Sequence, residues 1–226
     1  IPRVFPEFSS KKVLTMSWED GELLDSNHVT GLSQDRRDCL GAAFMELMFR
    51  EIFEWRLVQT DPHFGNYKVR STQEGDRIVL LDFGAVRQFP QRYLDPFSGL
   101  VYGALNEDVE EIISSGLKIG FLRDQDTENV WELFSRMCIT AVEGFKKEYE
   151  SPNCDGSDPG DNPYLWGETD LIKRLSILVR DAIFAFRLRP PPREAVFLDR
   201  KMIGIYTIIT KLNLHMGPRK LILKYL

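Results

Sequence analysis

The sequence contains little that would cross-link the chain, carry it across a membrane or attract a polyanion. Its 226 residues include only three cysteines, Cys39, Cys138 and Cys154, which form no C-x-x-C pair. This spacing fits neither a disulfide framework nor a zinc site and is typical of a reducing compartment. No apolar stretch approaches the ~18 residues of a membrane-spanning helix. With 29 basic and 34 acidic side chains, the net charge of −5 gives no reason to expect nucleic acid as a partner.

The amino-terminal residues also lack a targeting pattern. The first ten residues do not show the basic-then-apolar order of a signal peptide. The first residue, Ile1, is not a methionine, so we expect that further residues precede it in the natural protein. The 43% content of hydrophobic residues is enough to bury one substantial core, and we expect one intracellular lobe with appendages.

Apolar periodicity predicts a mostly helical chain of the α+β class. Ser33 is a good N-cap, and the apolar residues that follow recur at helical spacing, which predicts a long central helix with one buried stripe. The stripe consists of Leu40, Ala43, Phe44, Leu47, Met48, Ile52 and Trp55. Further helices are predicted over residues 106–118, 124–149, 171–186 and 194–212, with a loop at 151–163.

Two short β regions accompany the helices. Residues 12–16 favour a strand that ends at a turn over 18–21, and residues 67–69 and 77–81 flank a polar turn at 71–76. The second pattern predicts a β-hairpin. It places Asp61, Asn66 and Asp82 at the ends of elements, where side chains from different loops converge.

These three residues have the order found in protein kinases. Asp61 and Asn66 are separated as in D-x-x-x-x-N, and Asp82 opens the D-F-G sequence after the hairpin. Phosphoryl transfer needs magnesium ligands and a carboxylate near the attacking hydroxyl or water. Asp61 therefore suits the role of catalytic base, while Asn66 and Asp82 suit the role of magnesium ligands. The alternative is that Asp61 and Asn66 cap a turn and Asp82 ends a strand, which requires three coincidences.

Longer stretches around these residues resemble the UbiB or aarF-domain family of atypical kinases, the coenzyme Q biosynthesis kinases. The resemblance covers almost the whole chain. It rests on four stretches of sequence. They are residues 13–21, which begin with VLTM, QTDPHFGNY at 59–67, LLDFGAVR at 80–87, and a fourth stretch in two parts, RLRPPP at 187–192 and LDRKMIG at 198–204. The fourth stretch and Thr60 are similar to the mitochondrial-type branch.

The resemblance implies a carboxy-terminal lobe of a kinase-like fold that binds ATP and Mg²⁺ and acts as an ATPase or small-molecule kinase in ubiquinone biosynthesis. It implies an adenine-contacting hinge at Met16, Ser17, Trp18 and Glu19. It also implies association with a membrane, on the bacterial cytoplasmic side or the mitochondrial matrix side. Candidate partners are membrane lipid, quinone precursors and ubiquinone-biosynthesis proteins.

The chain departs from the family pattern in its amino-terminal part. Relatives of this kind carry an amino-terminal lobe with an alanine-rich loop, a strand lysine paired with glutamate, and a Lys-x-Gly-Gln motif, which are not found here. We therefore expect residues 1–21 to be the end of that lobe with the hinge, and residues 22–226 to be the carboxy-terminal lobe. We expect this chain alone to bind nucleotide weakly. Since no Ala-Pro-Glu follows Gly84, a protein substrate is disfavoured.

Other residues admit two interpretations. His63 more often holds a loop through backbone hydrogen bonds than acts as a base. Trp131, Phe134 and Phe145 fit a core better than a quinone pocket. Three basic residues flank the proline run at 190–192, namely Arg187, Arg189 and Arg193. They could contact phospholipid or simply be solvated.

Two rival functions remain. One is a catalytically weak module that senses nucleotide or lipid and acts as a regulatory scaffold. The other is an aminoglycoside- or choline-kinase-like phosphotransferase, which Gln59 and Gly84 disfavour.

Overall fold

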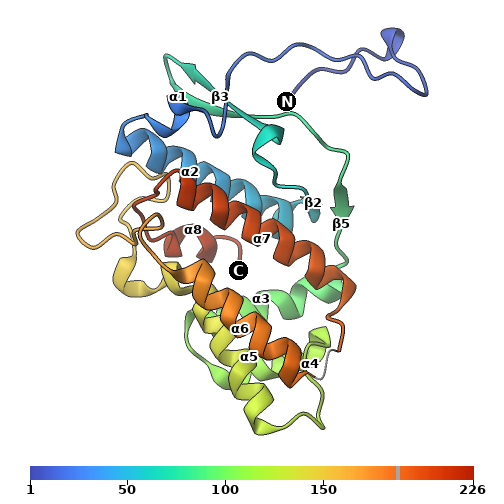
Figure 1. Ribbon diagram of the computed structural model, residues 1–226, viewed down its shortest axis with the longest axis vertical. Coiled ribbons are helices and arrows are strands. Elements are labelled where there is room, and N and C mark those ends of the chain that lie inside the picture. Colours follow the sequence, from blue (N-terminus) through green and yellow to red (C-terminus); the bar gives the residue numbers. More distant parts are fainter. Residues whose placement is uncertain (187–188) are drawn as a thin grey trace.

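Helices form most of the structure and lie below a small sheet (Figure 1). The computed structural model describes residues 1–186 and 189–226. The helices of the described residues are α1 Asn27–Thr30, α2 Gln34–Phe49, α3 Gln91–Leu105, α4 Val109–Ile119, α5 Glu128–Ala141, α6 Leu171–Ala185, α7 Arg193–Lys211 and α8 Arg219–Leu223. Helices α2 and α7 pack together, and the pairs α3–α4 and α5–α6 form a second group beneath them. The mostly α prediction is confirmed.

The predicted central helix is confirmed as α2, although its end differs. A π-helical segment, Arg50–Glu54, continues α2 and carries Ile52 into the core. Trp55 lies beyond this segment and is 44% exposed, and Ala43 is also exposed. Both were predicted to belong to the buried stripe. At Trp55 the prediction failed because the π turn changes the angular spacing of the residues and the helix ends before this residue. Ala43 lies in the regular part of α2, on a side of the helix that faces solvent.

The strands form two small antiparallel sheets. The strands are β1 Glu22–Leu23, β2 Leu57–Gln59, β3 Tyr67–Thr72, β4 Gly75–Leu80 and β5 Val86–Gln88. Their order is β1-β3-β4 in one sheet and β2-β5 in the other. The predicted hairpin is confirmed as β3–β4, with pairs that run from Tyr67–Leu80 to Thr72–Gly75. The turn is tighter than predicted because Gly75 adopts a positive φ of 116°.

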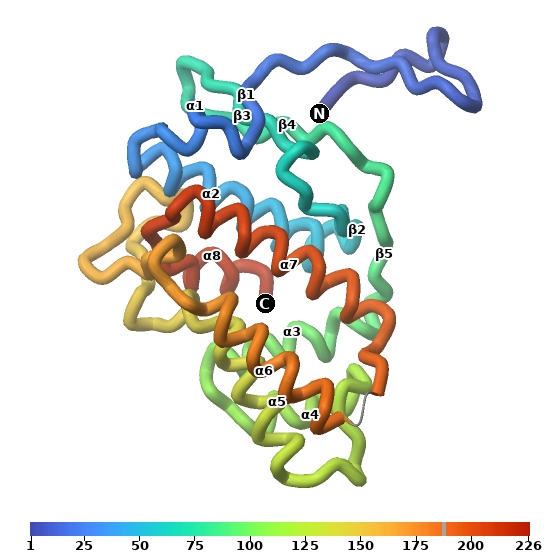
Figure 2. The backbone as a smooth tube through the Cα atoms, viewed as in Figure 1, coloured from blue at the N-terminus to red at the C-terminus, as the bar shows by residue number. Residues whose placement is uncertain are grey.

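The amino-terminal arm contains no strand at residues 12–16, and that prediction is wrong. The segment makes two isolated bridges, Ser10–Val13 and Val4–Met16, instead of a ladder. Figure 2 shows the arm as an extended loop that reaches away from the helices. A β-favouring sequence forms a strand only where a partner strand is available.

The carboxy-terminal helices agree with the sequence more closely. Helices α6 and α7 coincide with the predictions at 171–186 and 194–212 within one residue at each end. The predicted helix at 124–149 is shorter, because α5 ends at Ala141 and two 3₁₀ turns follow, Glu143–Phe145 and Lys147–Tyr149. Residues 151–163 form a loop, as predicted. In the described residues, no helix combines the length and apolarity needed to cross a membrane.

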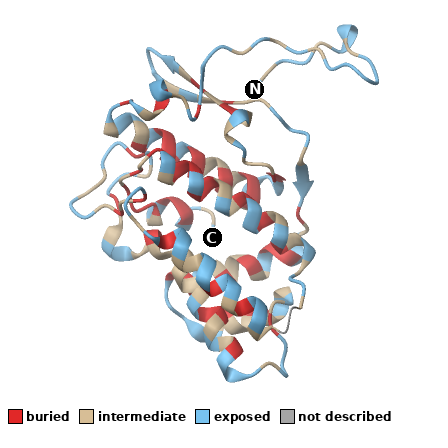
Figure 3. Cartoon of the chain, in the orientation of Figure 1, coloured by how far each residue is buried: buried red, intermediate tan, exposed pale blue. Residues whose placement is uncertain are grey.

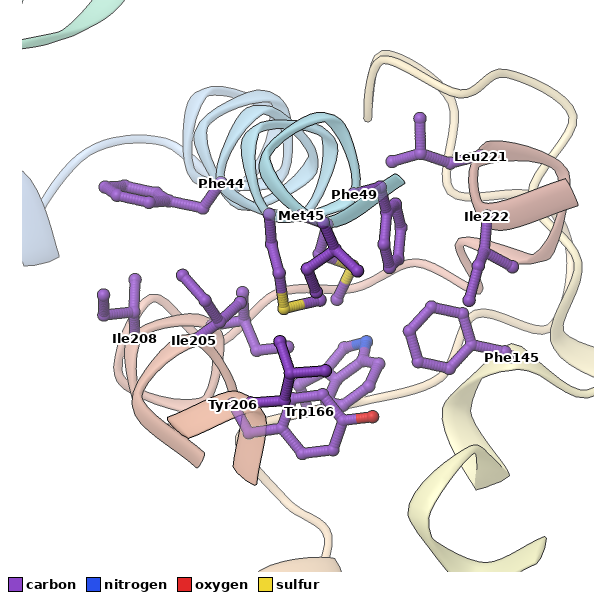
Figure 4. Close-up of a cluster of buried hydrophobic side chains, with 14 of the residues drawn as sticks. Phe44, Met45, Phe49, Phe145, Trp166, Ile205, Tyr206, Ile208, Leu221 and Ile222 are labelled. Carbon is purple, nitrogen blue, oxygen red and sulfur yellow. The ribbon is translucent and has the colours of Figure 1, made fainter. Parts of the chain in front are cut away.

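Buried side chains concentrate along α2 and α7 (Figure 3). Figure 4 shows how these helices meet α8 and two aromatic residues, Phe145 and Trp166. The indole N–H of Trp166 donates a hydrogen bond to the Met216 carbonyl at 2.9 Å, and its ring lies edge-on to Phe145 and Tyr206. Phe134 and Phe145 are at most 1% exposed, which confirms that they belong to the core.

Candidate catalytic site

Two backbone contacts bracket the loops that carry the predicted site residues. The N–H of Leu81 donates to the Asn66 carbonyl at 3.0 Å, one residue beyond the last pair of the β3–β4 ladder. At the other end, the N–H and the hydroxyl of Thr60 both donate to the Ala85 carbonyl, at 2.9 and 2.8 Å. The loop at 61–65 and the loop at 82–84 are therefore held side by side.

Asn66 and Asp82 face a common space. Both line a cavity of ≈ 10 Å³ whose wall also includes Glu51 and Phe83. This volume is about what one water molecule requires. The close placement follows from the hairpin register, because Asn66 lies opposite Leu81 and Asp82 is the next residue.

Asp61 lies next to Asn66 on the same loop. The side-chain amide of Asn66 donates to the Asp61 carbonyl at 2.8 Å and lies 3.5 Å from one of its carboxylate oxygens. Gln59 donates to the same carbonyl at 2.7 Å. The structure therefore brings Asp61 together with Asn66, and Asn66 together with Asp82.

The other carboxylate oxygen of Asp61 pairs with a residue from the far end of the chain. Nη2 of Arg200, on α7, contacts Asp61 Oδ1 at 2.5 Å. The Asp61 side chain is 37% exposed and that of Arg200 is 61% exposed. The carboxylate is therefore oriented by an ion pair while solvent still reaches it.

Two further residues of α7 support the catalytic loop. A Cβ on Gly204 would lie 2.0 Å from the Pro62 ring, so only glycine allows the helix to approach the loop this closely. One turn earlier, Lys201 lies 2.6 Å from Glu51 in an ion pair whose two side chains are 1% and 7% exposed. Glu51 belongs to the π-helical segment after α2 and also lines the cavity beside Asn66.

Burial governs the charges of this pair. Removal from water raises the pKa of Glu51, and the nearby Lys201 ammonium opposes that rise. Burial likewise lowers the pKa of Lys201, against the attraction of Glu51. Each group therefore depends on the other to remain charged in this environment.

His63 holds the loop, as the sequence indicated. The side-chain Nδ1 of His63 accepts a hydrogen bond from the Gly65 N–H at 3.1 Å, and the backbone N–H of His63 donates to the Asp61 carbonyl at 2.8 Å. These bonds shape the 3₁₀ turn Phe64–Asn66 that delivers Asn66.

The predicted hinge is fastened to the hairpin. Lys68 donates to the Glu19 carbonyl at 2.9 Å, and Arg70 contacts the Glu19 carboxylate at 2.5 Å. Trp18 is 82% exposed, with the Lys68 ammonium 4.7 Å from its ring centre. The N–H of Ser17 donates to the Arg3 carbonyl.

Met16, the remaining hinge residue, is 44% exposed. The contact of these four residues with adenine stays a prediction.

The oxygen atoms near the cavity fit a magnesium ion. Because Asn66 donates through its amide nitrogen, its amide oxygen is left for a cation, and no described residue donates to it. Asp82 accepts the Gly84 N–H through Oδ1 at 2.7 Å, which leaves Oδ2. Magnesium takes one or two protein oxygens together with water and phosphate, which matches this pair. The described residues contain no cluster of three histidine, cysteine or acidic side chains suited to a metal.

The sequence prediction missed the contribution of α7. The stretch LDRKMIG at 198–204 carries part of the family resemblance, yet no role was assigned to its residues. Arg200 and Gly204 contact the loop at 61–65, and Lys201 pairs with Glu51 in the π-helical segment after α2. A basic pair followed three residues later by a glycine in the middle of a helix was the available signal.

Comparison with known proteins gives a consistent result. The ABC1 atypical kinase-like domain matches residues 1–116, just over half of the chain. A probable serine/threonine-protein kinase of Dictyostelium discoideum, abkA, is 30% identical over 213 residues, which cover 94% of this chain and 36% of the relative. The mitochondrial atypical kinase coq-8 of Caenorhabditis elegans is 30% identical over 215 residues, which cover 94% of this chain and 26% of the relative.

The mitochondrial atypical kinase COQ8 of Saccharomyces cerevisiae is 24% identical over 221 residues, which cover 98% of this chain and 41% of the relative. The chain thus spans about a third of the length of the curated relatives that it matches.

Proposed function

Because the chain belongs to the ABC1 or UbiB family of atypical kinases, we propose that it binds ATP with Mg²⁺ and transfers or hydrolyses the γ-phosphoryl group. The observation that carries this proposal is the hairpin register, which sets Asn66 and Asp82 on one cavity. The bond between Asn66 and the Asp61 carbonyl adds the third residue. Asn66 and Asp82 also close their own turns, through the Asp61 carbonyl and the Gly84 N–H, so the support for a shared site is the cavity that both side chains line.

Each side chain has a distinct task in this proposal. Asp61 accepts the proton of the attacking hydroxyl or water, and Arg200 holds its carboxylate toward the site. The amide nitrogen of Asn66 fixes the loop backbone at Asp61. Asn66 and Asp82 hold magnesium through their free oxygens, and the bound ion supplies positive charge that offsets the charge of the phosphate oxygens.

The adenine of ATP is proposed to contact the hinge at Met16, Ser17, Trp18 and Glu19. The ties from Lys68 and Arg70 to Glu19 support this placement, because they hold the hinge to the strand that begins directly after Asn66. We expect residues 1–226 alone to turn over ATP slowly, since the resemblance assigns the phosphate-clamping lysine and the covering loop to an amino-terminal lobe.

We further propose that the complete protein supports ubiquinone biosynthesis at a membrane, on the mitochondrial matrix side or its bacterial equivalent. The resemblance to the coenzyme Q biosynthesis kinases supports this proposal, and so do relatives whose names describe mitochondrial atypical kinases. Membrane lipid, quinone precursors and other proteins of the same biosynthesis are the proposed partners.

The first test replaces Asp82 in the complete natural protein. Asp82→Asn keeps the shape of the side chain but removes the charge that the metal requires. We expect magnesium-dependent ATP binding and turnover to fall at least about a hundredfold, because a hard divalent cation strongly prefers carboxylate oxygen. Binding is measured by titration with ATP at several magnesium concentrations, and turnover by release of ADP.

Asp124→Asn is the matched control, because Asp124 is exposed in the segment before α5 and makes no hydrogen bond with the described residues. Its ATP turnover should equal that of the natural sequence. Normal turnover by the Asp82→Asn variant would contradict the proposal. ATP binding without turnover in the natural protein, with or without lipid vesicles, would favour the sensing scaffold instead.

A further inference from the structure

A second, larger pocket opens between β5 and the first turns of α7. Its volume is ≈ 390 Å³, and its lining includes Arg87 and Phe89 on one side and Arg193, Glu194 and Phe197 on the other. This volume lies in the lower part of the range for small-molecule sites and is too small for a folded partner. We refer to it as the Arg87–Arg193 pocket.

Both walls of this pocket lead directly to Asp61. On one wall, Val86 pairs with Gln59, two residues before Asp61. On the other wall, Phe197 precedes Arg200 by three residues, and Arg200 contacts Asp61. At 1.5 Å per helical residue, the pocket therefore extends from about 5 Å to about 10 Å from Arg200 along α7.

The polar groups of the pocket select for negative charge. The guanidinium carbon of Arg87 lies 3.7 Å from the centre of the Phe197 ring, a cation–π contact that places the charge of Arg87 on the aromatic wall of the pocket. Neither Arg87 nor Arg193 forms an ion pair with an acidic side chain among residues 1–186 and 189–226. Glu194 contributes one opposing charge, so the pocket favours a ligand with one anionic group over a polyanion.

A smaller part of the lining is apolar. Val86 is 40% exposed and Phe197 is half-buried, so these two side chains offer the apolar surface of the pocket, whereas Phe89 is only 3% exposed and closes its wall. Arg193 opens α7, seven residues before Arg200, so along this helix it lies farther from the Asp61 contact than Phe197 does. Arg87 is on β5, opposite Val58 of β2. A ligand anchored at Arg193 would point its opposite end toward the Asp61 carboxylate.

We propose that the Arg87–Arg193 pocket binds the phosphate acceptor, a small molecule in which a carboxylate or phosphate and a hydroxyl group lie at opposite ends of a ring-sized apolar body. This inference rests on the proposed function, since Asp61 must be the base. The hydroxyl oxygen attacks the γ-phosphorus of ATP and forms the new P–O bond. The bond from the γ-phosphorus to the β,γ-bridging oxygen breaks, ADP leaves with that electron pair, and the hydroxyl proton passes to Asp61.

Neighbouring residues agree with this assignment. Arg189 does not extend the cationic surface of the pocket, because it is bound to Asp126 and to the Phe121 carbonyl. Arg187 lies outside the described residues. The anionic ligand would therefore be recognised by the two arginines of the pocket and by no wider basic patch around residue 189.

The test uses the complete natural protein and para-hydroxymethylbenzoate, which carries a carboxylate and a hydroxyl across one ring. We expect saturable binding by calorimetric titration and, with radiolabelled ATP, formation of the phosphate ester. Arg87→Gln and Arg193→Gln should each weaken binding about tenfold, because each removes a charge-assisted hydrogen bond. Phe197→Leu, which keeps the volume apolar but removes the stacking surface, should weaken binding as well.

Arg136→Gln is the matched control, since Arg136 is exposed on α5 and does not line the pocket. It should bind the probe normally. Benzyl alcohol, which lacks the charge, and inorganic phosphate, which lacks the ring, should bind far more weakly than the probe. Circular dichroism of each variant verifies that the protein is folded.

Three results would overturn the inference. They are no saturable probe binding, equal binding by the arginine variants and the control, and arginine-dependent binding without ester formation while ATP turnover is normal. Binding to phosphatidylcholine vesicles that contain phosphatidic acid, without binding of the soluble probe, would assign the pocket to a lipid headgroup and would also overturn it. ATP turnover without any probe, measured on the same preparations, tests the proposed function separately.

Discussion

At the scale of single residues, the most informative contact is the one between Arg200 and Asp61. The guanidinium group of Arg200 orients the Asp61 carboxylate from outside the loop. In the proposed function this carboxylate is the base, which must be oriented before the substrate arrives. Arg200 contacts neither the hinge nor the cavity at Asn66 and Asp82 among the described residues. Its effect should therefore be confined to the chemical step.

Replacing Arg200 tests this role. In the complete natural protein we expect Arg200→Gln to lower kcat about tenfold while KM for ATP stays unchanged, because one charge-assisted hydrogen bond to Asp61 is lost. Arg200→Lys should recover part of the rate, and Arg136→Gln should have none of the effect. Steady-state kinetics measure both constants. A rise in KM for ATP equal to the fall in kcat would point to a structural role instead.

The difference between what was predicted and what was missed is clear at this scale. The proximity of Asp61 to Asn66 and of Asn66 to Asp82 was predictable because their spacing in the sequence is local, while their catalytic and metal-binding roles stay a prediction. Arg200 was not assigned, because its partner lies 139 residues earlier and no local pattern records such a contact. The same holds for Lys201 and Glu51, which become a pair only after α7 has packed on α2.

At the scale of elements, α7 packs against the loop at 61–65. Its central turn supplies the partner of Asp61, the close approach to Pro62 at Gly204 and the ion pair that joins it to the π-helical segment. The contact between Lys201 and Glu51 spans 2.6 Å, and the two side chains are only 1% and 7% exposed. The pair therefore stabilises the fold chiefly by charge compensation.

A double-mutant cycle measures that compensation. Lys201→Met leaves the Glu51 carboxylate buried without an opposite charge, so we expect the free energy of unfolding to fall by about 3–5 kcal/mol. The double variant Glu51→Gln with Lys201→Met should recover much of this loss. Urea denaturation of all four proteins gives the coupling. Equal destabilisation by the single and double variants would show that packing, not charge, dominates.

The elements that sequence patterns predicted well are those with a strong pattern of their own. Helices α6 and α7 repeat apolar residues over several turns, and their bounds were correct within one residue. Residues 12–16 have only β propensity, and propensity without a partner strand produced isolated bridges. Helix α8 has five residues, which is too few for a periodic pattern to be recognised.

At the scale of the whole molecule, arginines join the upper helices to the lower group. Arg219 on α8 donates to the Leu105 carbonyl at the end of α3 and to Asn106 beyond it. Arg189, just before α7, forms a two-pronged ion pair with Asp126 in the loop between α4 and α5. The side chains of the second pair are only 13% and 14% exposed. Shielding of this kind makes the pair worth more than an open surface ion pair.

This pair gives the fold a pH dependence of known sign. The hydrogen bonds from Arg189 hold the pKa of Asp126 below its model-peptide range. The contribution of this ion pair to stability is therefore complete above the pKa of Asp126 in the unfolded chain, which is near 4, and is lost as the pH falls through the lower pKa of Asp126 in the folded protein. We expect Asp126→Asn to lower the free energy of unfolding by about 1–2 kcal/mol at pH 7.

The difference from the natural sequence should shrink steadily as the pH is lowered below 4. Thermal melts from pH 7 to pH 3 measure it. Asp124→Asn, two residues earlier and exposed, provides the reference for a general loss of negative charge. A constant difference between the Asp126→Asn variant and the natural sequence at every pH would contradict this account.

The distance between Asn66 and Asp82 is set only by the antiparallel pairing of β3 and β4 at the base of the hairpin. Residues added at the tip, between Thr72 and Gly75, would lengthen the turn and leave that base intact. A single residue deleted within one strand would instead turn Asp82 to the opposite face. The tip is therefore a suitable place for a fluorescent label or an epitope tag, and natural variation in hairpin length can accumulate there without altering the chemistry below.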